Sequence, residues 1–185
     1  MTREEALKTL KENLFNQNLI KHCLAVEAIM RALARRFNES EEEKWRLAGL
    51  LHDIDYEKVK DDLSQHSLVG AKMLEELDLD KDICQAVKVH NEAHGIPPET
   101  LMEKALFVTD PLTGLIVAAT LVLPSKKIKD LTAENVLNRF KEKAFARGAN
   151  REIIGKCEEL LGLDLEEFTE VGLKAMQEID SDLGL

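Results

Sequence analysis

The 185-residue sequence has few aromatic residues and few cysteines, and it lacks the common nucleotide-binding and nucleophile motifs. Its three cysteines, Cys23, Cys84 and Cys157, are odd in number and widely spaced, which argues against a disulfide framework and a CxxC metal site. There is no P-loop, no GxGxxG after a strand and no nucleophile elbow. Kinase, dehydrogenase and serine-hydrolase functions therefore have no support.

Long apolar runs and targeting segments are also missing. No apolar run is expected to reach the ~20 residues of a membrane-spanning helix. The N-terminal segment MTREEALKTLKENL is charged throughout and lacks the apolar centre of a signal peptide. Together with free thiols, these absences predict a cytoplasmic protein with no membrane partner.

The formal net charge of −10 argues against nucleic acid as the main partner. The charge is uneven, because residues 124–151 carry eight basic and three acidic side chains. A solvated helix and its preceding loop are the simpler interpretation of this segment, and a phosphate-attracting rim or a docking face is the alternative. The oligomeric state is left open, and a homo-oligomer is compatible with the sequence.

The helix signals run along the whole chain, and no alternating strand pattern is found. Thr2 with Glu5, and Ser40 with Glu43, form capping-box patterns that predict the starts of two helices. Between them, apolar residues at 19, 23, 26, 30, 33 and 37 form a helical stripe. These features predict an all-α protein.

Further helices are expected over about 66–77, 80–94 and 99–122. Pro111 should kink or restart the last of these. Three N-caps are expected for helices that run to the C-terminus, at Thr132, Asn150 and Asp164. The predicted organisation is an N-terminal helix (1–17), a helical-bundle core (18–123) and a C-terminal helical extension packed on that core (124–185).

All five histidines lie between residues 22 and 94: His22, His52, His66, His90 and His94. Helical periodicity predicts that most of them face inward and that His90 and His94 lie one above the other on one helix face. A single inward histidine is usually a hydrogen-bonded core residue, and Asp110 before Pro111 has the pattern of a helix N-cap. Several such histidines together with Asp53 and Asp110 favour a transition-metal site, because imidazole and carboxylate suit Zn, Fe, Mn or Co.

The order of these residues resembles a known family. An isolated His22 is followed by His52–Asp53 within LLHDID, then by His66, by VKVHNEAH and by ALFVTD. Over residues 18–123 this pattern is similar to the HD-domain metal-dependent phosphohydrolase superfamily, and LLHDID resembles its HDIG subgroup. The fold that the resemblance implies is a single HD-domain helical bundle with additional C-terminal helices.

The resemblance also implies a set of site residues. By position, the ligands of a first metal ion are His22, His52, Asp53 and Asp110. Asp53 is the catalytic candidate and would bridge to a second ion held by His66 and His90, so one or two divalent transition-metal ions are expected. His94 and, more weakly, Lys88 are candidates for contact with a substrate phosphate.

One position departs from the family pattern. Asp55 replaces the glycine of HDIG, and glycine permits backbone conformations that aspartate tolerates less well. The turn after the HD pair is therefore expected to differ. The segment HNEAH is not a zincin helix, because Asn91 stands where that motif needs its glutamate.

The activity that the resemblance implies is hydrolysis of a phosphate ester or anhydride by metal-activated water. The expected partner is a small phosphorylated molecule, most simply a nucleotide or dinucleotide. Two alternatives stay open: a di-iron oxygenase that uses the same six ligands, and a non-catalytic module that senses a nucleotide.

Overall fold

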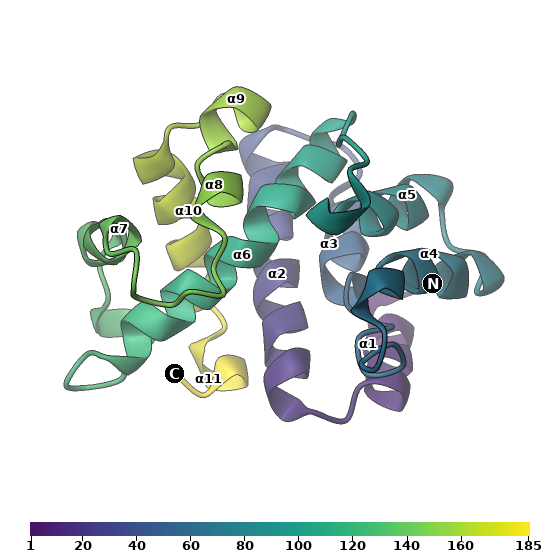
Figure 1. The fold of residues 1–185 in the computed structure, drawn as a ribbon, viewed down its shortest axis with the longest axis horizontal. Coiled ribbons are helices and arrows are strands. Elements are labelled where there is room, and N and C mark those ends of the chain that lie inside the picture. The colour runs from purple at the N-terminus through teal and green to yellow at the C-terminus, as the bar shows by residue number, and fades with distance from the viewer.

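Helices are the only regular elements of the computed structural model, which describes all 185 residues (Figure 1). The predicted all-α class is therefore confirmed. The first helix, α1 (Arg3–Asn13), begins at the predicted capping box, in which Thr2 Oγ1 accepts from the amide of Glu5 and the Glu5 side chain accepts from the amide of Thr2. These reciprocal bonds satisfy two of the amides that a helix start leaves free.

The next two helices are α2 (Gln17–Arg36) and α3 (Glu42–Leu51). The capping box predicted at Ser40 and Glu43 is wrong: α3 begins at Glu42, and its N-cap makes no side-chain hydrogen bond. Glu42 and Glu43 instead lie in the first turn, where carboxylates interact favourably with the helix dipole. The buried apolar residues of α3 extend to Leu51, and His52 follows directly.

Two short helices, α4 (Leu68–Glu76) and α5 (Lys81–Val89), complete the half of the molecule around α3. The helix predicted over 80–94 ends early, at Val89. Asn91 is extended and its side chain accepts from the amide of Ala93, which starts a separate 3₁₀ turn, η2 (Glu92–His94). His90 and His94 therefore do not share a helix face, and that expectation is wrong.

The longest helix, α6 (Leu101–Leu121), runs unbroken through Pro111. A proline inside a helix costs about 3 kcal/mol. Thirteen residues of α6 are buried, and each large apolar side chain among them contributes about 1.5–3 kcal/mol, so packing outweighs the proline. Asp110 thus lies within a helix and is not an N-cap.

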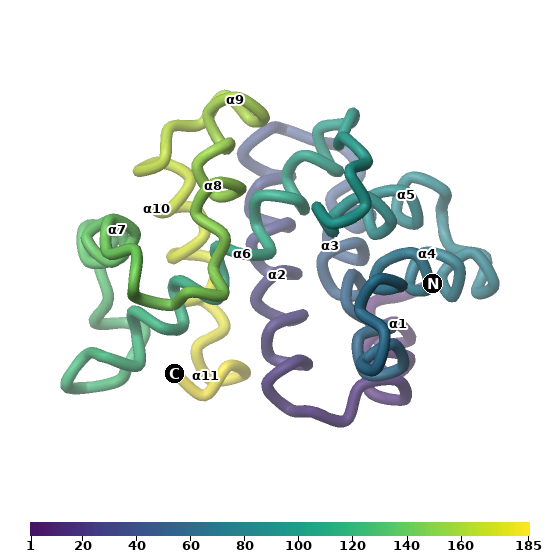
Figure 2. The backbone as a smooth tube through the Cα atoms, viewed as in Figure 1, coloured from purple at the N-terminus to yellow at the C-terminus, as the bar shows by residue number.

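α6 is also long and apolar enough to cross a membrane by length and composition, which corrects the expectation that no such segment exists. The segment is mostly buried inside the protein, and the core helices of soluble proteins pass the same test. In Figure 2, α6 and α2 pass between α1, α3, α4 and α5 on one side and the C-terminal helices on the other.

The chain after α6 folds into more helices than the predicted three. Thr132, Asn150 and Asp164 are the N-caps of α7, α8 and α10, as predicted. The elements of this part are η3 (Ile128–Asp130), α7 (Ala133–Lys141), α8 (Arg151–Ile154), α9 (Cys157–Leu161), α10 (Leu165–Gln177) and α11 (Asp180–Leu183). α10 packs against α2 and α6.

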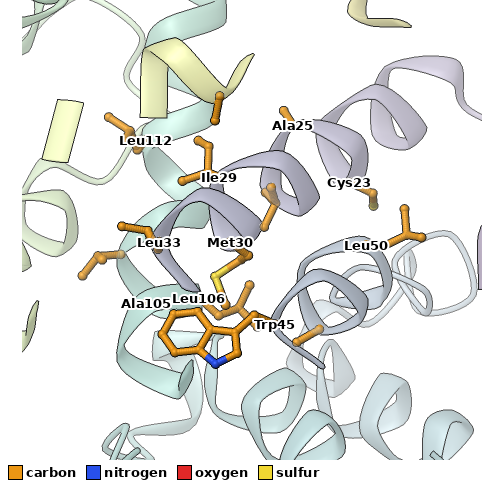
Figure 3. Packing of buried hydrophobic residues seen from close by; sticks show 14 of the residues in the cluster. Cys23, Ala25, Ile29, Met30, Leu33, Trp45, Leu50, Ala105, Leu106 and Leu112 are labelled. Atoms are coloured by element: carbon orange, nitrogen blue, oxygen red, sulfur yellow. The ribbon is translucent and has the colours of Figure 1, made fainter. Parts of the chain in front are cut away.

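One hydrophobic cluster of 46 buried residues joins these parts. Figure 3 shows Ile29, Met30 and Leu33 of α2 packed near Leu106 and Leu112 of α6. The cluster also includes residues of the C-terminal helices, such as Phe168 and Met176. α2 and α6 are therefore held firmly between two layers, and both carry residues of the site described next.

Candidate metal centre

Four of the six polar residues predicted as metal ligands stand where a helix or turn ends, and the other two lie inside helices. His52 is the C-cap of α3 and is followed by Asp53, while His90 is the C-cap of α5. His66 ends the 3₁₀ turn η1 (Leu63–Gln65). His22 and Asp110 come from the middle of α2 and α6. The fold brings these six side chains, from five segments, to one place.

Their ligand atoms form two groups that share Asp53. In the first group, His22 Nε2 lies 3.1 Å from His52 Nε2, 3.0 Å from Asp110 Oδ1 and 3.6 Å from Asp53 Oδ2. In the second, Asp53 Oδ1 lies 3.2 Å from His66 Nε2 and 3.7 Å from His90 Nε2. Within each of the triads His22–His52–Asp53 and Asp53–His66–His90, the atoms lie within 4.8 Å of one another. Each triad could therefore hold one ion, and the two triads share the Asp53 carboxylate.

Hydrogen bonds at the outer edge of the rings set the protonation of the histidines. His52 Nδ1 donates to the carbonyl of Gly49 at 2.8 Å, and His90 Nδ1 donates to that of Val87 at 2.6 Å. His66 Nδ1 donates to Asp55 Oδ1 at 2.9 Å. In a neutral imidazole, a proton on Nδ1 leaves Nε2 as the acceptor. In its neutral form, each of the three rings therefore turns a lone pair toward the centre.

His22 reaches the same state through a hydroxyl. Thr113 Oγ1 donates its single proton to the carbonyl of Asp110 at 2.8 Å, so it can only accept from His22 Nδ1, 2.9 Å away. His22 Nε2 is thus the free nitrogen. Metal-bound histidines characteristically donate their other N–H to a carbonyl, carboxylate or hydroxyl in this way.

A divalent metal ion fits this arrangement. His90 Nε2 is buried and has no hydrogen-bond partner, a state that costs about 1–3 kcal/mol if nothing binds the atom. Four nitrogen lone pairs and two carboxylates converge without a lysine or arginine between them, so a cation is the group that satisfies them together.

Electrostatics prepare His52 and Asp53 for metal binding, whereas His66 must lose a proton when an ion binds. Burial lowers the pKa of His52 to about 4. Burial opposes ionisation of Asp53, but the adjacent imidazole rings of His52, His66 and His90 hold the pKa of Asp53 well below its usual range. Burial likewise opposes protonation of His66, yet its bonds to Asp53 and Asp55 raise its pKa to about 10. Asp53 is therefore anionic and His52 neutral at physiological pH.

Asp55 is a functional residue that the sequence interpretation missed. Its side chain is fully buried and accepts three hydrogen bonds: from His66 Nδ1, from the amide of Ser67 at 2.9 Å and from the amide of Gly70 at 2.7 Å. Asp55 has no positive φ angle, so the turn needs no glycine there. The residue that departs from HDIG orients His66 and caps α4.

The two residues predicted to contact substrate lie away from the opening of the centre. His94 Nε2 donates to the carbonyl of His66 at 2.6 Å, behind that ring. The Lys88 side chain is exposed, and its carbonyl accepts from Ser67 Oγ. Neither residue lines the cavities at the centre, and their contact with substrate stays a prediction.

Two adjoining cavities open from the centre. One, of about 310 Å³, is bordered by Leu19, Tyr56, Asn91 and Glu92 together with the predicted ligands. The other, of about 230 Å³, lies between α6 and residues 148–150 of the loop before α8. No lysine or arginine lines either cavity.

The basic segment 124–151 contributes to this wall through its backbone. Arg151 donates to six main-chain carbonyls between Arg139 and Ala149, which folds the loop back on itself. Asn150 Nδ2 then donates to Glu92 Oε1 at 3.1 Å and ties the loop to η2. At least one of the basic residues is thus structural.

An all-helical bundle with a shared-carboxylate His/Asp centre defines the class of this protein. The family model described as "HD domain" matches residues 19–115, nearly the span predicted from the sequence. The chain belongs to the HD domain family, and the resemblance noted in the sequence is confirmed.

The relatives fall into two kinds. Ribonuclease Y of Lawsonia intracellularis is 29% identical over 142 residues, which cover 75% of this chain and 27% of that protein. Ribonuclease Y of Nitratidesulfovibrio vulgaris is 31% identical over 142 residues, which again cover 75% of this chain and 27% of that protein. An uncharacterized protein of Methanocaldococcus jannaschii is 33% identical over 153 residues, 77% of this chain and 86% of that protein.

The aligned part of this chain spans about a quarter of the length of the Ribonuclease Y relatives. No solved structure matches.

Proposed function

We propose that this protein is a metal-dependent phosphohydrolase that cleaves a phosphate ester or anhydride of a small molecule by attack of water. The observation that carries the proposal is the convergence of four imidazole Nε2 atoms on the shared carboxylate of Asp53. Such an arrangement is built to hold cations, and divalent cations beside an open cavity suit a substrate with a phosphate group.

The residues divide into two ligand sets. His22, His52 and Asp110 would hold one ion, His66 and His90 would hold the other, and Asp53 would bridge them. When bound, divalent metal ions lower the pKa of coordinated water toward neutrality and take up negative charge of the phosphate. Fe, Mn, Zn and Co all suit this nitrogen and oxygen set.

The chain's own groups supply orientation and charge. Thr113, Gly49, Val87 and Asp55 fix the four rings by accepting their Nδ1 protons. Tyr56 packs edge-on against His66, with the ring centroids 5.2 Å apart, and borders the cavity where a substrate would enter. Apart from the predicted ligands, the titratable side chains of the cavity walls are Glu92 and Tyr56.

The name Ribonuclease Y points to a second substrate class, the phosphodiester bonds of RNA. We favour a small molecule, because binding a nucleic-acid strand requires several phosphate contacts from basic residues and the cavities at the centre contain none.

The experiment is metal analysis combined with turnover. We expect close to two equivalents of a divalent metal in protein purified without oxygen, and near-complete loss in Asp53→Ala. The control variant Asp61→Ala, at an exposed position with no side-chain hydrogen bond or ion pair, should keep both equivalents of metal.

Turnover is then assayed on phosphomonoesters, nucleotides and a short RNA. Release of phosphate by wild type and Asp61→Ala, but not by Asp53→Ala, would support the proposal. Metal content that the Asp53 substitution leaves unchanged would contradict the ligand assignment. Oxygen consumption by iron-loaded protein, without phosphate release from any substrate, would favour an oxygenase instead.

A further inference from the structure

A third hollow lies beside the metal centre, between α2 and α6, and we call it the α2–α6 groove. Its volume is about 520 Å³. Small and aliphatic side chains make up much of its wall: Ala25, Val117, Ala118, Leu121 and Leu183. The one charged side chain in its wall, apart from the titratable His22, is Lys21, and no acidic side chain borders it, although the chain has 35 acidic residues.

The groove adjoins the metal centre. His22 and Gly114 line both the groove and the 230 Å³ cavity that also contains Asp110 and His90. Thr113, which accepts from His22 Nδ1, lies in the groove wall as well. A ligand whose phosphate lies at the centre can therefore extend into the groove past Gly114.

Gly114 is unusual for its position. It lies exposed in the interior of α6, one turn after Asp110, where glycine destabilises a helix relative to alanine. No protein atom lies within 4 Å of the place where a Cβ would stand. Packing in the protein therefore does not require a glycine here, whereas a ligand that passes close to the helix backbone does.

We propose that the α2–α6 groove binds the aliphatic part of a substrate in which an apolar alcohol is esterified to a single phosphate. This inference rests on the proposed function. In the reaction, the oxygen of water bonds to phosphorus, the bond from phosphorus to the ester oxygen breaks, and the alcohol leaves after gaining a proton. The products are the free alcohol and inorganic phosphate.

The wall chemistry favours this ligand over others. Alanine, valine and leucine side chains bury methylene groups well. Of the polar side chains in the wall, Thr113 and His22 already bond each other, which leaves Asn18 and Lys21 to meet a sugar or base. Lys21 is the one lysine or arginine in the groove and the two cavities together, which argues against a second or third phosphate. One phosphate on one apolar chain fits both observations.

Binding tests the groove separately from catalysis. The probes are n-alkyl phosphonates from methyl to octyl, which keep the charge but have no ester bond to cleave, titrated into metal-loaded protein by calorimetry. We expect the Kd to fall about fourfold for each methylene that enters the groove. The same trend is expected in kcat/KM for release of phosphate from the corresponding alkyl phosphates.

Three variants locate the effect. Ala118→Leu fills the groove, and Gly114→Ala narrows the passage to it, so both should flatten the dependence on chain length. Ala32→Leu is the matched control, because Ala32 is a half-buried helical alanine in a separate hollow between α2 and α10. Gly114→Ala should not lower the Tm, so its effect would not reflect unfolding.

The outcomes separate the two proposals. A Kd that is independent of chain length overturns the groove assignment, even if methyl phosphate is hydrolysed. An equal loss of the chain-length dependence in Ala32→Leu and Ala118→Leu overturns the groove assignment as well. Chain-length dependence that Ala118→Leu removes, without hydrolysis of any ester, supports the groove and refutes the hydrolase.

Discussion

Replacement of Asp55 by asparagine should disable one half of the metal centre without removing any metal ligand. Asp55 Oδ2 accepts from the amides of Ser67 and Gly70, and Oδ1 accepts from His66 Nδ1. An asparagine that keeps its oxygen on the two amides must turn its NH₂ group toward His66. Two donors would then face each other, and His66 would move its proton to Nε2, the atom 3.2 Å from Asp53.

The expected size of the effect follows from these contacts. Loss of a group that orients a metal-bound histidine lowers metal affinity about 10–100-fold. A hydrogen bond to a buried carboxylate is worth about 1.5–3 kcal/mol, so the free energy of unfolding should fall by about 2 kcal/mol. The ion that His22, His52 and Asp110 would hold does not depend on Asp55 and should stay.

The assay is metal titration together with urea unfolding of the metal-free protein. We expect Asp55→Asn to bind one equivalent as wild type does and the second 10–100-fold more weakly. Asp164→Asn is the control, since Asp164 is an exposed N-cap of α10 and asparagine caps equally well. Wild-type affinity for both ions in Asp55→Asn would refute the argument about the His66 tautomer.

The remaining predictions concern the metal ligands and acid stability. His66→Ala should bind one ion in place of two and lose most activity while circular dichroism stays helical, whereas Asp110→Asn should release the ion of the other group. At the surface, hydrogen bonds from Arg35 and Arg31 lower the pKa of Glu42 to about 2 from 4.5. Its ion pairs therefore contribute stability that is present above about pH 4.5 and is lost as the pH falls toward 2. Glu42 is partly exposed, so Glu42→Gln should lower the free energy of unfolding at neutral pH by less than about 1 kcal/mol. The substitution should have no effect near pH 2, and urea unfolding at the two pH values measures both.

Helix starts with a local signal were predictable from the sequence. The Thr2 capping box and the N-caps Thr132, Asn150 and Asp164 depend on bonds between residues two or three apart, which the sequence displays directly. Ser40 carries the same signal, but α3 starts two residues later. A local pattern gives a preference, and the packing of α3 against α2 sets the actual start.

Helix ends and the path of α6 were harder to predict. The stripe of α5 continues past Val89 in sequence, yet the Asn91 side chain competes for a backbone amide and stops the helix. Pro111 indicates a break, but burial along α6 overrides it. In both cases the deciding interaction is one that periodicity does not contain.

The candidate site divides in the same way. The identity of its six polar side chains was readable, because histidines and carboxylates at the ends of apolar runs need a common partner. Their protonation was not readable, since it depends on Thr113 Oγ1 and on the carbonyls of Gly49 and Val87. Asp55 was missed because its partners lie 11 to 15 residues away. A carboxylate directly after the buried Ile54 was the available signal.

The two halves of the centre are supported by different kinds of structure. His22 and Asp110 come from the interiors of α2 and α6, which the hydrophobic cluster holds in place whether or not metal is bound. His66 follows a short 3₁₀ turn, and it is placed by the single carboxylate that also caps α4. Binding at the His66 half must therefore depend on how α4 is held, while the His22 half is preorganised. Metals should fill the two halves in that order, with the His22 half first.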